Sequence, residues 1–293
     1  MEPHAKEALF LNFLFLTFVV SAILFQSVAK KQYNTKTEKR GPFLFNSVSV
    51  IFAALFFFLS DTDGFHLSPN VIPYILGFAA SYGTAAICSF MALREGSLSL
   101  TSLVTSYSLM IPTLYGLLFL QEKANAVLII GLILLCISLF LVNTKKGETR
   151  ITLRWGLWVF FAFLGNGFCS VVQTAQQTAF QGQFKSEFMI GALSLLSVFF
   201  LFCSFCFEKN TQTVCLKKGS LWMILNGLAN GAVNLLVMIL VGRMPTSVMF
   251  PIISGGGIIL ATAFSFFFYK EKLTFKQYLG VLFGTGSVIL MNL

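Results

Sequence analysis

Long apolar segments alternate with short polar clusters along nearly the whole chain. Ten segments are long enough to cross a hydrocarbon core of about 30 Å as helices. They cover residues 8–29, 43–60, 70–92, 97–120, 124–143, 154–176, 188–207, 219–241, 246–269 and 274–292. The pattern predicts an all-α integral membrane protein with ten transmembrane helices and no soluble domain.

The end of the chain repeats its middle. Residues 94–143 align without a gap on residues 243–292, with identical pairs such as Arg94 and Arg243 or Gly131 and Gly280. Each copy has an Arg, an apolar span, a Glu-Lys turn and a second apolar span that ends in Asn. This plan predicts two halves, residues 1–147 and 148–293, with five spans each. Because five is odd, the halves must insert in opposite orientations, as an inverted 5+5 repeat.

The basic residues predict the orientation in the membrane. Loops after the odd-numbered spans hold 16 of the 20 Lys and Arg residues. The other side holds only Lys6, Lys123, Lys185 and Arg243. Since positive loops stay in the cytoplasm, both termini are expected outside. The net charge of +9 is then a topology signal, and a nucleic-acid partner is not expected.

Composition excludes most other classes. Hydrophobic residues make up 56% of the chain and charged residues 11%, so the solvent of this protein is a lipid bilayer. The six Cys and two His show no metal-ligand spacing, and no catalytic motif is present. We therefore expect no enzyme, no cofactor and no metal.

The ends of the two halves resemble a known family. The segments FLQEKANAVLIIGLILLCISLFLVN (119–143) and FFYKEKLTFKQYLGVLFGTGSVILMNL (267–293) are similar to the EamA domain of the drug/metabolite transporter (DMT) superfamily. The resemblance implies a bundle of two halves around a central cavity that opens alternately to each side. It does not name a substrate, because the family moves amino acids, drugs, sugars and nucleotide-linked compounds. Well-known ten-span members are drawn with cytoplasmic termini, and the charge count here departs from that.

Polar side chains within the spans are candidates for substrate binding, because they are costly in lipid. Two spans carry amides or hydroxyls at helical spacing, which places them on one face. These residues are Asn166, Ser170, Gln173 and Gln177 in the sixth span and Asn226, Asn230 and Asn234 in the eighth. The alternative is that they join helices by hydrogen bonds. Gly227 and Gly231 form a GxxxG motif that favours close contact on a neighbouring face of the eighth span.

Aromatic and helix-breaking residues complete the predicted site. Tyr82, Tyr107 and Tyr115 are candidate cavity walls, because a buried phenol needs a partner. Pro112 and Pro251 interrupt helical hydrogen bonding, and Gly255, Gly256 and Gly257 loosen the following turn. We expect hinge or site roles for them, with close glycine packing as the alternative.

Charged side chains are absent from the middle of every predicted span. Glu122 and Glu271 stand at helix ends beside Lys123 and Lys272, where they are interpreted as turn and capping residues, with gating ion pairs as the alternative. The polar inventory suits a small neutral or zwitterionic solute, such as an amino-acid-like metabolite. The sequence thus predicts an alternating-access transporter in the cytoplasmic (inner) membrane. The alternatives are a multidrug exporter of lipophilic compounds and a non-transporting scaffold, and formation of a homodimer is left open.

Overall fold

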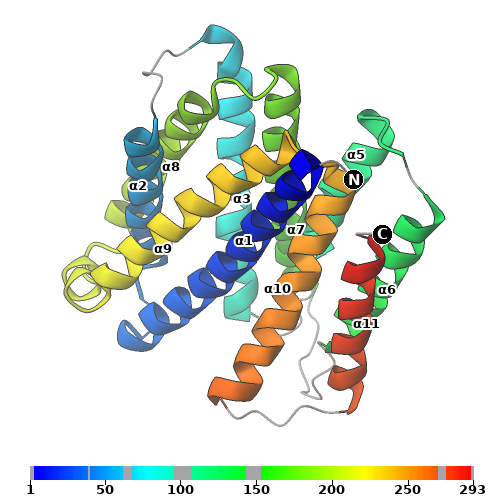
Figure 1. Ribbon diagram of the computed structural model, residues 1–293. Coiled ribbons are helices and arrows are strands. Elements are labelled where there is room, and N and C mark those ends of the chain that lie inside the picture. The colour runs from blue at the N-terminus through cyan, green and yellow to red at the C-terminus, as the bar shows by residue number, and fades with distance from the viewer. Residues whose placement is uncertain are drawn as a thin grey trace. The chain divides into compact units, whose positions relative to one another are not determined.

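The computed structural model describes residues 3–38, 40–61, 68–95, 107–123, 125–142, 153–269 and 275–291. In these ranges the regular secondary structure is helical (Figure 1). The α-helices are α1 Pro3–Lys36, α2 Pro42–Ser60, α3 Ile72–Glu95, α5 Met110–Phe119, α6 Ala126–Val142, α7 Leu153–Ala179, α8 Lys185–Phe207, α9 Gln212–Val241, α10 Thr246–Tyr269 and α11 Phe275–Met291. Short 3-10 turns, η1 Pro69–Val71 and η2 Tyr107–Leu109, precede α3 and α5.

Six helices in the described residues are long and apolar enough to cross a membrane, namely α1, α2, α3, α7, α8 and α9. Two shorter apolar stretches cover Tyr107–Phe119 and Ala126–Ser138. Large apolar side chains such as Phe10, Phe119 and Phe207 are exposed on the helix surfaces. Such exposure would be a liability in water and is ordinary in lipid. The chain is therefore a multi-pass membrane protein.

The helices pack into two compact units. Unit 1 comprises Met1–Val20, Ser81–Thr174 and Arg243–Leu293, and unit 2 comprises Ser21–Ala80 and Ala175–Gly242. In unit 1, α6 lies along α11 and α10 packs against α5 and α11. In unit 2, α2 packs against both α8 and α9 (Figure 1). Each unit draws on both sequence halves, so the division at residue 147 remains a prediction about the repeat.

The repeat is visible in unit 1, where its two copies of the last span lie against each other. The bounds of α11 are those of α6 displaced by 149 residues. Ser138 of α6 donates a hydrogen bond to the Gly280 carbonyl oxygen at 2.6 Å. Ser287 of α11 donates to the Gly131 carbonyl oxygen at 2.8 Å. These residues are each other's counterparts in the repeat, so the two helices contact each other reciprocally, as in a two-fold interface.

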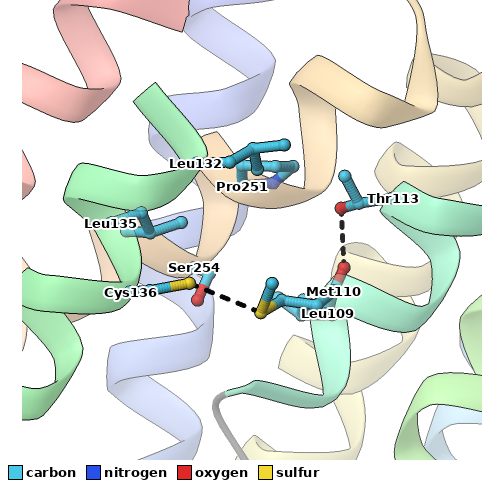
Figure 2. A pocket seen from close by; sticks show the side chains of 8 residues that line it. All are labelled: Leu109, Met110, Thr113, Leu132, Leu135, Cys136, Pro251 and Ser254. Atoms are coloured by element: carbon cyan, nitrogen blue, oxygen red, sulfur yellow. Dashed lines mark hydrogen bonds between the residues drawn. The ribbon is translucent and has the colours of Figure 1, made fainter. Parts of the chain in front are cut away.

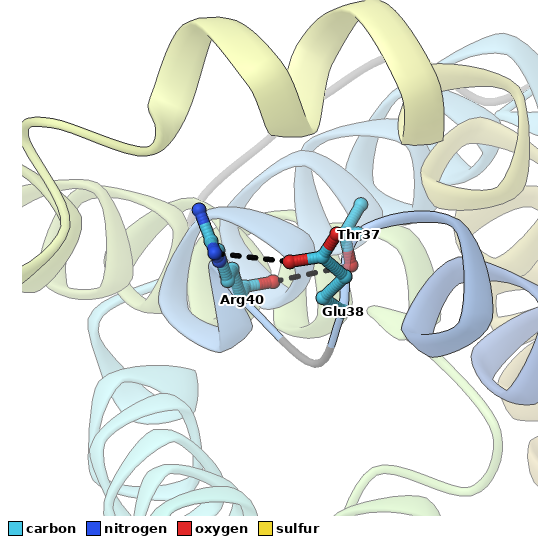
Figure 3. Close-up of polar contacts among 3 residues, drawn as sticks. All are labelled: Thr37, Glu38 and Arg40. Atoms are coloured by element: carbon cyan, nitrogen blue, oxygen red, sulfur yellow. Dashed lines mark hydrogen bonds and ion pairs between the residues drawn. The ribbon is translucent and has the colours of Figure 1, made fainter.

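In unit 2, the turn between α1 and α2 is fixed by hydrogen bonds that start from α1. The Tyr33 hydroxyl lies 2.9 Å from the carbonyl oxygens of both Arg40 and Gly41. The Thr37 hydroxyl donates to the Tyr33 carbonyl at 2.8 Å. Figure 3 shows its longer contact of 3.4 Å with the Arg40 carbonyl oxygen and the exposed ion pair of Arg40 with Glu38 at 2.9 Å. Gly41 has a φ of 66°, a conformation that favours glycine. The turn thereby sets the position at which α2 begins.

The buried carboxylate of Glu208, directly after α8, caps the N-terminus of α2 in unit 2. Glu208, the residue after α8, accepts hydrogen bonds from the backbone N–H groups of Phe43 and Leu44 at 2.8 and 2.9 Å. Ser204 adds a third hydrogen bond at 3.1 Å. Since the first N–H groups of a helix have no partner within it, Glu208 satisfies the N-terminus of α2.

Candidate functional site

The predicted binding residues divide between the two units. Unit 1 contains Asn166, Ser170, Gln173, Tyr82, Tyr107 and Tyr115, and unit 2 contains Gln177, Asn226, Asn230 and Asn234.

The amide stripe of the sixth span lies on α7, and most of it is buried. Ser170, Gln173 and Gln177 are each at most 9% exposed, whereas Asn166 is half-buried. Gln176, on an adjacent face, is fully buried. Burial of three Gln side chains in the last two turns of one apolar helix is costly unless each amide finds partners.

At the end of α7, two of these amides form a chain that runs in one direction. The Gln176 Nε2 atom donates to the Gln183 backbone carbonyl at 3.0 Å. The Gln177 Nε2 atom donates in turn to Gln176 Oε1. Gln177 Oε1 is buried, and among the described residues no group donates a hydrogen bond to it. The chain therefore ends in an unused acceptor.

The asparagine side chains on α9 form hydrogen bonds with other groups of the protein. Asn226 donates from Nδ2 to Ser49 Oγ of α2 at 3.1 Å, and Ser49 donates to the Met223 carbonyl of α9. Asn234 Nδ2 lies 2.7 Å from Asn230 Oδ1. The contact of Asn226 favours the helix-joining interpretation for that residue. Asn230 and Asn234 are half-buried and remain predicted binding residues.

The predicted close contact of the GxxxG motif is confirmed. A Cβ atom added to Gly227 would collide with the Ser49 carbonyl oxygen, and one added to Gly231 would lie 2.8 Å from the Phe56 ring. Both contacts are with α2. The two glycines therefore allow α9 and α2 to approach, and this approach brings Asn226 to Ser49.

The three tyrosines lie in unit 1, and one has a clear structural role. The Tyr107 hydroxyl donates to the Cys136 carbonyl oxygen of α6 at 3.0 Å. Tyr115 stacks on Phe119 with ring centroids 5.4 Å apart, and it is half-buried, as is Tyr82 in α3. Tyr107 thus ties η2 to α6, and the cavity-wall role of the other two stays a prediction.

A small cavity in unit 1 lies beside Pro251 (Figure 2). Its lining comes from α5 with η2, from α6 and from α10, and consists of Leu109, Met110, Thr113, Leu132, Leu135, Cys136, Pro251 and Ser254. The cavity measures about 10 Å³, which is room for roughly one water molecule. It is too small for a metabolite. It lies beside the turn of α10 in which Pro251 removes one helical hydrogen bond, so this turn has both fewer packing contacts and one hydrogen bond fewer.

The predicted hinge residues occupy different environments. Pro251 lies inside α10 and is buried, and Pro112 is buried in α5. A Cβ atom added to Gly257 would meet nothing within 4 Å, whereas one added to Gly256 would lie 3.2 Å from Val20. Gly255 is buried. Close packing therefore does not explain glycine at Gly257.

Glu122 binds the start of α10. Its carboxylate accepts hydrogen bonds from the backbone N–H groups of Thr246 and Ser247, both at 2.8 Å, and from the Thr246 hydroxyl at 2.9 Å. Lys123 beside it is exposed. This geometry supports the capping interpretation of Glu122. Its repeat counterparts Glu271 and Lys272 lie outside the described residues.

Some contacts escaped the sequence analysis. Ser138 and Ser287 are identical across the repeat, so their identity was a usable signal. Glu208 carried no such signal, because its partner α2 lies more than 160 residues away in the chain. Gln183 acts through its backbone carbonyl, which any residue would supply.

Comparison with known proteins agrees with the predicted family. Residues 9–144 match the model of the EamA-like transporter family, which confirms the resemblance for the first half, including residues 119–143. The second segment, 267–293, lies outside the matched residues. One solved crystal structure, whose title names no function, aligns with this chain with a TM-score of 0.73 and 14% sequence identity. The alignment covers 95% of this chain and 98% of that one, and at this identity it shows a shared fold alone. No curated protein matches the chain in sequence.

Proposed function

We propose that this chain, whose residues 9–144 match the EamA-like transporter family, is a membrane transporter of the DMT type. We propose further that it carries a small neutral or zwitterionic metabolite. Transport would cross the cytoplasmic membrane by alternating access. The ten helices would form an inverted 5+5 repeat, with one half rocking on the other around a binding site between them.

The buried amides of α7 carry the proposal on substrate class. Gln173, Gln176 and Gln177 are each at most 4% exposed. No Asp, Glu, Lys or Arg stands near the middle of a predicted span. A solute with a strong net charge would lack a counter-charge there. Amides and hydroxyls match the hydrogen-bonding groups of a neutral or zwitterionic molecule.

The environments of α10 support alternating access. Its N-terminus is held by Glu122, whereas its interior combines Pro251, an adjacent small cavity and a glycine with open space around it. A helix that is fixed at one end and weakened in its interior can bend about the weakened turn. The reciprocal contact of α6 and α11 supports the inverted repeat, because each copy makes the same bond to the other.

A ligand screen on the purified protein tests the proposal. Thermal unfolding in detergent would be followed with amino acids, polyamines, sugars, nucleotides and lipophilic cationic drugs. A ligand at about 100 times its Kd adds roughly 2.7 kcal/mol to the stability of the native state. Stabilisation by one class of polar metabolite is expected. Small shifts from many unrelated drugs would instead support a multidrug exporter, and no shift from any compound would support a scaffold.

A paired variant then tests the binding residues. Replacing Gln173 and Asn230 with Leu should abolish uptake of the stabilising compound into proteoliposomes while expression and folding persist. The matched control is Leu228→Ala, an exposed position on α9 that changes volume but no polar group. Full uptake by the double variant would refute the assignment of these two residues.

A further inference from the structure

The direction of the amide chain at the end of α7 is set by chemistry. A backbone carbonyl can only accept, so the Gln176 amide must present its NH₂ group to Gln183. The Gln176 oxygen then faces Gln177, which must present its own NH₂ group. Each amide is thereby fixed against a flip. The chain can end only in an oxygen, Gln177 Oε1, which is buried and accepts nothing.

An acidic residue stands ten positions after Gln177, on the far side of the turn in sequence. Glu187, in the first turn of α8, is 9% exposed. Within the described residues its carboxylate forms no ion pair and accepts no side-chain hydrogen bond. The N-terminal end of α8 offers it some electrostatic support. A cation beside this carboxylate would be favourable. The buried, unused amide oxygen of Gln177 is costly until it accepts a hydrogen bond.

Aromatic rings pack around the turn that joins the two helices. Phe180 lies edge-on to Tyr74 of α3, with centroids 5.7 Å apart, and edge-on to Phe184 at 5.5 Å. All three rings are half-buried. Backbone hydrogen bonds from Phe180 to Gln176 and from Gly182 to Gln177 hold the turn against α7. The turn thus carries aromatic rings, and the helix ends on either side of it carry the acceptor oxygens of Gln177 and Glu187. Aromatic rings and acceptor oxygens are the kinds of group that recognise an ammonium ion.

We propose that the end of α7 and the first turn of α8 form a binding subsite for an amino group. Gln177 Oε1 would accept a hydrogen bond from an N–H of the ligand, and Glu187 would supply the opposite charge. The inference rests on the proposed function, because it assigns this subsite to the amino end of the transported metabolite. It narrows the substrate to molecules with a primary or secondary amine.

Methylation of the ligand tests the subsite without changing its charge. The probes are glycine, L-leucine and L-phenylalanine, each paired with its N,N,N-trimethyl betaine, which keeps the positive charge and has no N–H. Binding would be measured by thermal shift on the full-length protein in detergent. The wild type should bind at least one free amino acid at least tenfold more tightly than its betaine.

The variant Gln177→Met keeps the length of the side chain and removes the acceptor, together with the donor to Gln176 Oε1. It should lose that tenfold preference while binding the betaine as the wild type does. Gln181→Met, an exposed position in the same turn, is the matched control and should keep the preference. Glu187→Gln should weaken amino acid and betaine equally, because it removes charge rather than the N–H acceptor.

The outcomes separate this inference from the function on which it rests. If other polar metabolites bind but amino compounds do not, the transporter proposal stands and the subsite is refuted. If Gln177→Met lowers thermal stability but leaves the preference intact, Gln177 is a structural residue and the subsite is refuted. If no compound in either panel binds the wild type, both proposals fail.

Discussion

The capping role of Glu122 can be separated from a gating ion pair by mutation. Glu122 accepts three hydrogen bonds at the start of α10, and Lys123 beside it is exposed. Glu122→Ala leaves two backbone N–H groups and a hydroxyl without their acceptor. Loss of a cap costs about 0.5–2 kcal/mol, and loss of a negative charge at a helix N-terminus costs about 0.3–1 kcal/mol more. We therefore expect a loss of about 2 kcal/mol from the free energy of unfolding.

The assay is thermal unfolding of the purified variants in one detergent. For a chain of 293 residues, 2 kcal/mol corresponds to a decrease in Tm of roughly 3–4 °C. Glu122→Gln should fall between Ala and wild type, because it keeps one acceptor oxygen and loses the charge. Lys123→Ala should leave the Tm within about 1 °C, since an exposed lysine contributes little. Equal losses for Glu122→Ala and Lys123→Ala, without further loss in the double variant, would refute capping and establish the ion pair.

Three further predictions use the same unfolding assay. Gly227→Ala should lower the free energy of unfolding by about 1–3 kcal/mol, because its Cβ collides with α2. Gly257→Ala should leave that free energy unchanged or raise it by up to about 1 kcal/mol, while it slows transport. A large loss of stability in Gly257→Ala would refute the hinge. Ser138→Ala and Ser287→Ala should cost similar amounts, about 0.6–1.7 kcal/mol each, since the repeat makes the two bonds equivalent. Asn226→Leu should lower stability through the lost bond to Ser49, and an unchanged Tm would return Asn226 to the candidate binding residues.

The helices were largely predictable, because lipid imposes a simple rule on sequence. A spanning segment must be apolar and helical, so hydropathy alone located most described helices to within several residues. The exception is the predicted span 97–120, where the described α-helix is α5, Met110–Phe119, and residues 97–106 lie outside the described residues. The repeat was also readable, and it aligned α6 with α11 before their contact was known. Hydropathy could not reveal which helices pack together. The pairing of α2 with α8 and α9 depends on particular residues, such as the two glycines of α9 and the Glu208 cap.

The candidate site was predictable only as a set of residue types. Helical spacing grouped Asn226 with Asn230 and Asn234 because it measures direction around one helix. It contains no information on what faces that direction. The structure places Ser49 of α2 at hydrogen-bonding distance from Asn226, and this contact distinguishes Asn226 from its neighbours. Tyr107 is similar, since its hydroxyl already binds a backbone carbonyl of α6.

Whether an amide in a membrane helix can serve a solute depends on which of its donors and acceptors the protein leaves unused. Asn226 and Gln177 have nearly the same chemistry, and both are at most 9% exposed. The NH₂ group of Asn226 binds the partner helix, and this bond helps hold α9 to α2. The NH₂ group of Gln177 binds its neighbour Gln176, and its oxygen accepts nothing. A lost donor bond at Asn226 should therefore appear as a loss of stability. A lost acceptor at Gln177 should appear as a change in ligand preference, because this buried oxygen leaves a hydrogen bond that a ligand can complete.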